Sequence, residues 1–175
     1  MNEIPDLENV RQKLLTFPTT EDALNYLKKK LICTITSFFK KHGPLPSMVF
    51  FVTSDLYPEF ILIPSIGLET PEGKTALKYT ILDMCKDPKI IAAGMIVNGS
   101  AKILKNEKND ETQKNDFEDT QDIIMLIFST PSNEEAITYY VNSETKTILG
   151  KTSFTNVQCG GKFSNFFELR KATMN

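Results

Sequence analysis

The histidine content of the chain limits the acid–base chemistry that it can perform. His42 is the only histidine among 175 residues, although histidine is the usual general base and a favoured metal ligand near neutral pH. It follows Lys40 and Lys41 and precedes Gly43-Pro44, a pattern typical of a helix C-terminus, where positive charge interacts favourably with the helix dipole. We therefore expect His42 to end a helix and assign it no catalytic or metal-binding role.

The segment 159–162 is the stretch that comes nearest to a ligand-binding motif. Consecutive glycines at Gly160 and Gly161 let backbone amides converge on an anion, and Lys162 adds positive charge. A complete phosphate-binding loop is longer and has Ser or Thr after its lysine, whereas Phe163 follows here. The favoured interpretation is a plain turn. An anion-binding turn made by Gly160, Gly161 and Lys162 is the alternative.

A second candidate cluster combines carboxylates with a tyrosine. Asp55, Tyr57 and Glu59 lie between two apolar segments and are expected in a β-hairpin. Carboxylates that the fold brings close to a tyrosine or lysine can carry acid–base chemistry when their pKa values are perturbed. These three residues are the candidate site if the protein is an enzyme or binds a small molecule.

The composition argues against several other classes of site. Formal net charge is −2, and Arg11 and Arg170 are the only arginines, whereas recognition of phosphate or guanine depends on the planar arginine fork. The three cysteines are widely separated and lack the spacing of a metal site. We therefore expect no nucleic-acid partner, no metal and no cofactor.

The chain also lacks the signals of export and membrane insertion. Its first residues contain no basic segment followed by an apolar one. No apolar run approaches the roughly 20 residues of a membrane-spanning helix. Three unpaired thiols suit a reducing compartment. We expect a soluble, cytoplasmic protein without membrane association.

Hydrophobic periodicity predicts three helices. The clearest covers residues 20–42, because apolar residues recur along one face at spacings of three and four. Shorter helices are expected over residues 5–15 and from Thr70-Pro71-Glu72 to about Asp87-Pro88. The stripe of the long helix is expected to pack on the protein's own sheet, and a dimer seam is the alternative, so the protein is a monomer or a homodimer. The residues of the stripe are Leu24, Leu27, Leu31, Ile35 and Phe38.

Apolar, β-rich segments between these helices predict a sheet. The Asn98-Gly99 pair within residues 90–104 is either a hairpin turn or a bulge in one long, bent strand, and we favour the long strand. Residues 105–121 are polar and expected to form a mobile loop. The tail from Phe163 to Leu169 is a short helix or a last strand. The expected strands are 48–53, 60–63, 90–104, 122–129, 136–142 and 147–151.

This order, with helices first and strands later, predicts a fold of the α+β class. We expect a single domain over residues 1–175, with a mostly antiparallel sheet and two or three helices packed on one face. Three segments prompt a comparison with known proteins: Gly43-Pro44-Leu45-Pro46, residues 90–97 and the hairpin from Met125 to Tyr140. In this layout the chain resembles uncharacterised small α+β proteins of bacteria and phages. That resemblance implies no activity.

These observations favour a small, non-enzymatic protein-binding module. The last strand of the terminal meander, residues 147–151, can leave its outer backbone groups unpaired and accept a strand from a protein partner. Lys146 and Lys151 flank it and would limit self-association. The alternative is an enzyme or small-molecule-binding protein whose carboxylate, tyrosine and lysine groups converge only in the fold.

Overall fold

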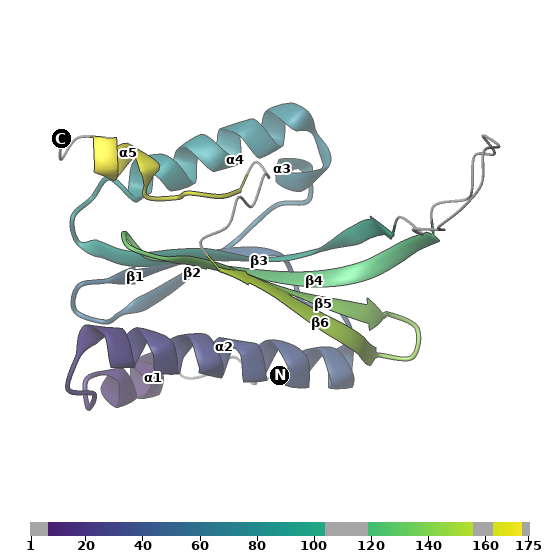
Figure 1. Cartoon of the computed structure of the whole chain (residues 1–175), viewed down its shortest axis with the longest axis horizontal. Helices are drawn as coiled ribbons and strands as arrows, with labels where there is room; N and C mark the ends of the chain where they lie inside the picture. The colour runs from purple at the N-terminus through teal and green to yellow at the C-terminus, as the bar shows by residue number, and fades with distance from the viewer. Residues whose placement is uncertain (1–6, 104–118, 156–162, 173–175) are drawn as a thin grey trace, which may run out of the picture.

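The fold is built around one six-stranded antiparallel sheet with the strand order β2-β1-β3-β4-β5-β6 (Figure 1). The computed structural model describes residues 7–103, 119–155 and 163–172. The strands are β1 (Met48–Thr53), β2 (Pro58–Leu62), β3 (Ile90–Ile103), β4 (Asp119–Ser129), β5 (Glu134–Asn142) and β6 (Thr147–Thr155). The helices are α1 (Leu7–Leu14), α2 (Thr20–His42), α3 (Ile66–Glu69), α4 (Pro71–Met84) and α5 (Glu168–Ala172).

The long helix α2 has the bounds that its sequence predicts. Thr19 caps the N-terminus, since its hydroxyl accepts a hydrogen bond of 3.1 Å from the Asp22 amide. At the other end Gly43 has a φ of 92°, and its N–H donates to the Phe39 carbonyl at 2.8 Å. Leu27, Leu31 and Ile35 are buried, as expected.

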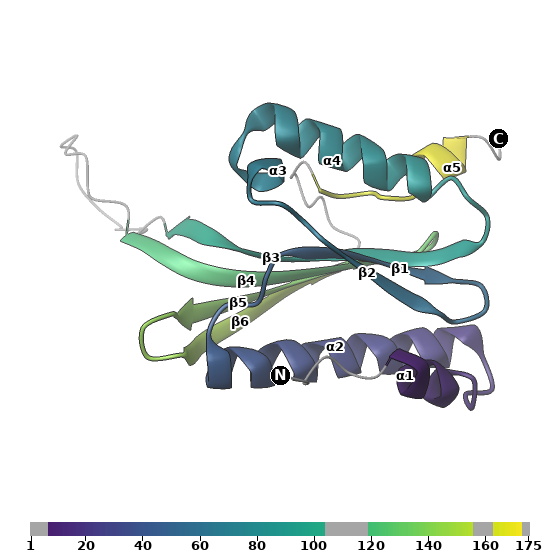
Figure 2. The ribbon, with the colours of Figure 1, turned by 180° about the vertical axis from the view of Figure 1, so that it is seen from behind.

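Helices cover both faces of the sheet, and not one face as the sequence suggested. In Figure 2, α1 and α2 lie on one side of the sheet, and α3, α4 and α5 lie on the other. The physical reason is visible in β1, where four consecutive residues are buried. Phe50 and Val52 join the core under α2, whereas Val49 and Phe51 join the core under α4. A strand that is apolar on both faces needs a cover on each. The antiparallel α+β sheet itself is confirmed.

β3 is one continuous strand through Asn98-Gly99. Asn98 pairs with Ile124 and Gly99 with Ile123, without a register shift anywhere along β4. The favoured long strand is therefore confirmed, and neither a hairpin turn nor a bulge is present against β4. Asn98 instead holds the entry to β1, because its side-chain amide donates to the Leu45 carbonyl. Pairing with a neighbouring strand overrides the local turn preference of this dipeptide.

Gly94 makes room for an aromatic cluster at the centre of the sheet. It lies in register between Phe50 on β1 and Phe128 on β4, whose rings are 5.6 Å apart. A Cβ on Gly94 would lie 2.1 Å from the Ile127 carbonyl oxygen and 2.3 Å from the Phe50 ring. The missing side chain therefore lets Phe50 pack directly over the backbone of β3.

The C-terminal half is a meander with an added helix. β4 begins at Asp119, so residues 119–121 belong to the sheet and not to the expected loop, while 104–118 lie outside the described residues. Residues 119–121 are polar, but they form part of the strand because their backbones pair with residues 101–103 of β3. After β6, Phe166 and Phe167 are buried under α4, and the tail ends in the helix α5.

Candidate functional site

Asp55 and Tyr57 lie in the turn between β1 and β2, beside Arg11 of α1. The Arg11 Nη2 atom is 3.4 Å from Asp55 Oδ2, and its guanidinium carbon lies 5.9 Å from the centroid of the Tyr57 ring. Thr53 completes the arrangement, since its hydroxyl donates to Asp55 Oδ1 at 2.5 Å. No pattern in the sequence pointed to Arg11, because it is 44 residues away from Asp55.

These contacts favour an ionised Asp55. The hydrogen bond from Thr53 is the main cause that lowers the pKa of the Asp55 carboxyl below its ordinary value of 3.8; partial desolvation opposes it, and a backbone hydrogen bond and the charge of Arg11 add to it. The side chain is also 63% exposed. An exposed, ionised and paired carboxylate ties α1 to the hairpin and is poorly suited to transfer protons at neutral pH.

Glu59 does not join this cluster. It is exposed and pairs in register with Phe51, whose side chain belongs to the core under α4. Paired residues of neighbouring strands point to the same face of a sheet, so Glu59 points to the α4 side. The structure therefore brings Asp55 and Tyr57 together with Arg11, and leaves the second carboxylate of the candidate site apart.

The remaining candidate residues fall in two groups. Gly160, Gly161 and Lys162 lie outside the described residues. His42 is the last residue of α2, as expected, and its ring centroid lies 4.8 Å from that of Phe38. Within residues 7–103, 119–155 and 163–172, no group of three or more His, Cys, Asp or Glu side chains is arranged to hold a metal ion.

The two edges of the sheet offer different backbones to a partner. β2 is five residues long and begins with Pro58, which has no N–H to donate. β6 is nine residues long, and among the described strands it pairs only with β5. Its side chains Leu149 and Phe154 are 58% and 47% exposed. Ile61 and Leu62 of β2 are exposed to a similar extent, at 47% and 66%, so the two edges differ in length and in backbone donors.

The two faces of β6 carry different side chains. Lys151 pairs with Tyr139 and lies over its ring, with Nζ 5.9 Å from the ring centroid, on the face toward α2. Phe154 pairs with Ala136, which belongs to the core under α4. The α2 side of the edge therefore carries a lysine, and the α4 side carries a partly exposed phenylalanine.

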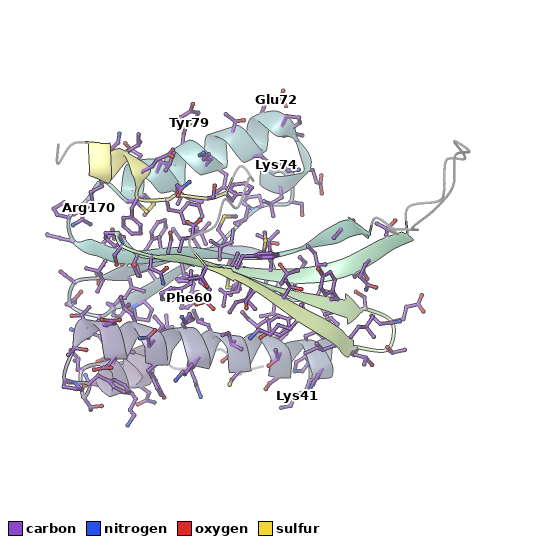
Figure 3. All side chains as sticks on the ribbon, viewed as in Figure 1. Lys41, Phe60, Glu72, Lys74, Tyr79 and Arg170 are labelled. Atoms are coloured by element: carbon purple, nitrogen blue, oxygen red, sulfur yellow. The ribbon has the colours of Figure 1, made fainter. Side chains whose placement is uncertain are left out.

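The turn before β6 is fixed to the end of α2. Lys146 donates from Nζ to the Lys41 carbonyl oxygen at 3.2 Å, and Figure 3 shows Lys41 at the C-terminal end of α2, next to the β5–β6 hairpin. Lys146 has a φ of 52°, a left-handed conformation typical of a tight turn. This contact anchors the start of the β6 edge to the helix layer.

Comparison of the chain with protein-family models, curated proteins and solved structures gave no match in any of the three. The resemblance to small bacterial and phage proteins therefore stays an expectation. In the part of the chain that the structure describes, no helix is long and apolar enough to cross a membrane.

Proposed function

We propose that the protein is a small, non-enzymatic interaction module that binds an extended segment of a protein partner along β6. The observation that carries this proposal is the position of β6, a nine-residue strand at the edge of the sheet. An exposed edge offers a row of backbone donors and acceptors, and a partner segment that adds a strand satisfies them. The exposed side chains of β6 then provide selectivity.

The other edge supports this choice by contrast. Natural proteins protect edges with short strands and prolines, and β2 has both features. β6 has neither in its nine residues, and its protection consists of one lysine, Lys151, and the register shift opposite Tyr140 and Val141. In the described part of the chain, β6 is therefore the edge that is suited to pairing with another chain.

The alternative, a small-molecule site or enzyme at Asp55, Tyr57 and Glu59, has less support. Asp55 already contacts Arg11 and Thr53. Glu59 pairs in register with Phe51, so its side chain lies on the α4 face of the sheet and apart from Asp55. A catalytic carboxylate usually needs burial or a second acid to tune its pKa. Asp55 is exposed and its pKa is shifted downward.

A pair of proline variants tests the proposal. Neighbouring residues of a strand direct their N–H groups to opposite edges, so Thr152→Pro and Ser153→Pro remove one donor facing β5 and one facing outward. We expect one variant to lose stability and the other to keep the wild-type fold, because proline is tolerated at an outward-facing edge position. The folded variant is then compared with wild type in affinity capture from the native host.

A matched control sits on the other edge. Leu62 of β2 is 66% exposed, and Leu62→Ser is expected to leave both fold and binding unchanged. The proposal requires a captured protein that is lost with the folded proline variant and kept with Leu62→Ser. The proposal is overturned if the folded proline variant of β6 still captures every protein that wild type captures. It is also overturned if the purified protein turns over a metabolite in a saturable manner.

A further inference from the structure

The charge around β6 identifies the kind of segment that it binds. Resting on the proposed function, we infer that the partner strand alternates acidic and apolar residues. Its carboxylates face Lys151 on the α2 side of the sheet, and its apolar side chains face Phe154 on the α4 side. Side chains of an added strand alternate between the two faces of the sheet, so each face of β6 selects every second residue of the partner.

The α2 side of this edge is rich in positive charge. β6 carries Lys151 and no acidic residue, and Lys146 precedes it. α2 packs against β6 and has no acid after Asp22. Its lysines are Lys28, Lys29, Lys30, Lys40 and Lys41. Lys28 is engaged by Glu135 at 2.6 Å, whereas the other four are exposed. In a protein with a formal charge of −2, this side attracts carboxylates.

Lys151 is placed to meet a carboxylate on an added strand. Its Nζ lies over the ring of Tyr139, so its charge stays on the α2 face. It is exposed, and an opposite charge on the neighbouring strand is within the reach of a cross-strand pair. The only acid in the turn before β6 is Glu144, which is also exposed. A partner carboxylate therefore meets Lys151 without a competing acid on β6.

The α4 side of the edge carries Phe154, with Gly150 and Thr152 as its neighbours on the same face of β6. Phe154 is 47% exposed, and its position opposite Ala136 leaves one side of the ring without a large cross-strand neighbour on β5. Gly150 lies opposite Tyr140, which is half-buried. An apolar side chain on an added strand would cover these rings, and burial of apolar area stabilises such a complex.

A second copy of this chain fits the same edge poorly. Residue 151 is the midpoint of a strand running from 147 to 155. Symmetric antiparallel pairing of two β6 strands along their full length therefore places Lys151 opposite its own counterpart. Like charges directly opposite each other destabilise a sheet. The charge that disfavours self-association is the one that favours an acidic partner.

Designed peptides test this inference without knowledge of the natural partner. The probes are capped, fluorescent nine-residue peptides that alternate valine with glutamate or valine with lysine, and binding is measured by fluorescence anisotropy. We expect the glutamate peptide to bind at least about tenfold more tightly than the lysine peptide, with the preference shrinking as salt rises. Lys151→Glu should reverse the preference.

Two control variants separate charge at β6 from charge elsewhere. Lys86 follows α4 and pairs with Asp83 on the other side of the molecule, so Lys86→Glu makes the same change in net charge and is expected to keep the wild-type preference. Phe154→Ser is expected to lower the affinity for the glutamate peptide several-fold. The salt dependence of that affinity should stay the same, because the change removes apolar contact only.

The outcomes distinguish this inference from the proposed function. Equal affinity for both peptides, a preference for the lysine peptide, no binding of either, or a concentration-dependent dimer formed through β6 would each overturn the acidic-partner inference. If a host protein is still lost with the folded β6 proline variant but is unaffected by Lys151→Glu, edge binding stands and only the acidic pattern fails.

Discussion

The two faces of the sheet are sealed to different extents, and β5 shows the difference most directly. Its side chains toward α2 are buried, with Ile137 at 2%, Tyr139 at 6% and Val141 at 2% exposure. Toward α4, Ala136 is buried at 4% exposure, whereas Thr138 and Tyr140 are only half-buried. The 23-residue α2 runs along the sheet, whereas the 14-residue α4 and the short α5 cover less of the opposite face (Figure 1).

The two layers differ because they are assembled from different numbers of segments. The layer on the α2 side consists mainly of one long helix, with α1 beside it (Figure 2), and α2 extends to the β5–β6 hairpin, where Lys146 contacts Lys41. The α4 layer is assembled from separate segments and depends on Phe166 and Phe167 from the C-terminal tail. On the α4 face, Tyr140 of β5 is half-buried and Phe154 of β6 is 47% exposed, and β6 is the last strand of the described sheet.

Two isoleucines with equal burial measure the strength of the two layers. Ile35 on α2 and Ile81 on α4 are each 1% exposed. We expect Ile35→Ala and Ile81→Ala each to lower the free energy of unfolding by about 2–5 kcal/mol, by lost transfer energy and a cavity. Ile35→Ala should cost more, because a helix that spans the sheet relaxes less around a cavity. Chemical denaturation measures both, and a larger cost at Ile81 would reverse the ranking of the layers.

Two cysteines compare the accessibility of the same layers. Cys33 on α2 is exposed, whereas Cys85 at the end of α4 is buried, and burial raises the pKa of the Cys85 thiol to about 12. In a Cys159→Ser background we expect iodoacetamide at pH 8 to modify Cys85 at least about a hundredfold more slowly than Cys33. Mass spectrometry of the labelled peptides gives both rates. Similar rates would mean that the α4 layer opens readily.

The smallest expected effect concerns Asp55, which ties α1 to the hairpin. Because the pKa of the folded carboxyl is lowered, its contribution to stability is present above the ordinary value of 3.8 and is lost as pH falls through the lower folded value. Wild type and Asp55→Asn should therefore differ in free energy of unfolding at neutral pH and converge in strong acid. Thr53→Val removes the hydrogen bond that is the main cause of the lowered Asp55 pKa. It should therefore reduce the change in the free energy of unfolding with pH over the same acid range.

The sequence determined the elements whose local signals are strong and whose partners are near in the chain. The stripe from Leu24 to Phe38, the cap at Thr19 and the stop at Gly43-Pro44 predicted α2 with its observed bounds. The cap at Thr70 and Pro71 predicted the start of α4. The meander of β4, β5 and β6 followed from apolar segments separated by short polar turns. Helix periodicity and caps depend on residues three or four apart, so no distant contact is needed to recognise them.

Tertiary structure alone decided how these elements meet. The pairing of β1 with β3 joins residues 37 to 48 positions apart, from Thr53 with Ile90 to Met48 with Ile96. The pairing of β3 with β4 overrides the turn preference of Asn98-Gly99. Arg11 reaches Asp55, and Glu59 is directed to the opposite face, because strand register sets which side chains share a surface. Lys151 and Phe154 lie on opposite faces of β6 for the same reason. The residue types of β6 were visible in the sequence. The face of the sheet on which each side chain lies was set only by the pairing of β6 with β5.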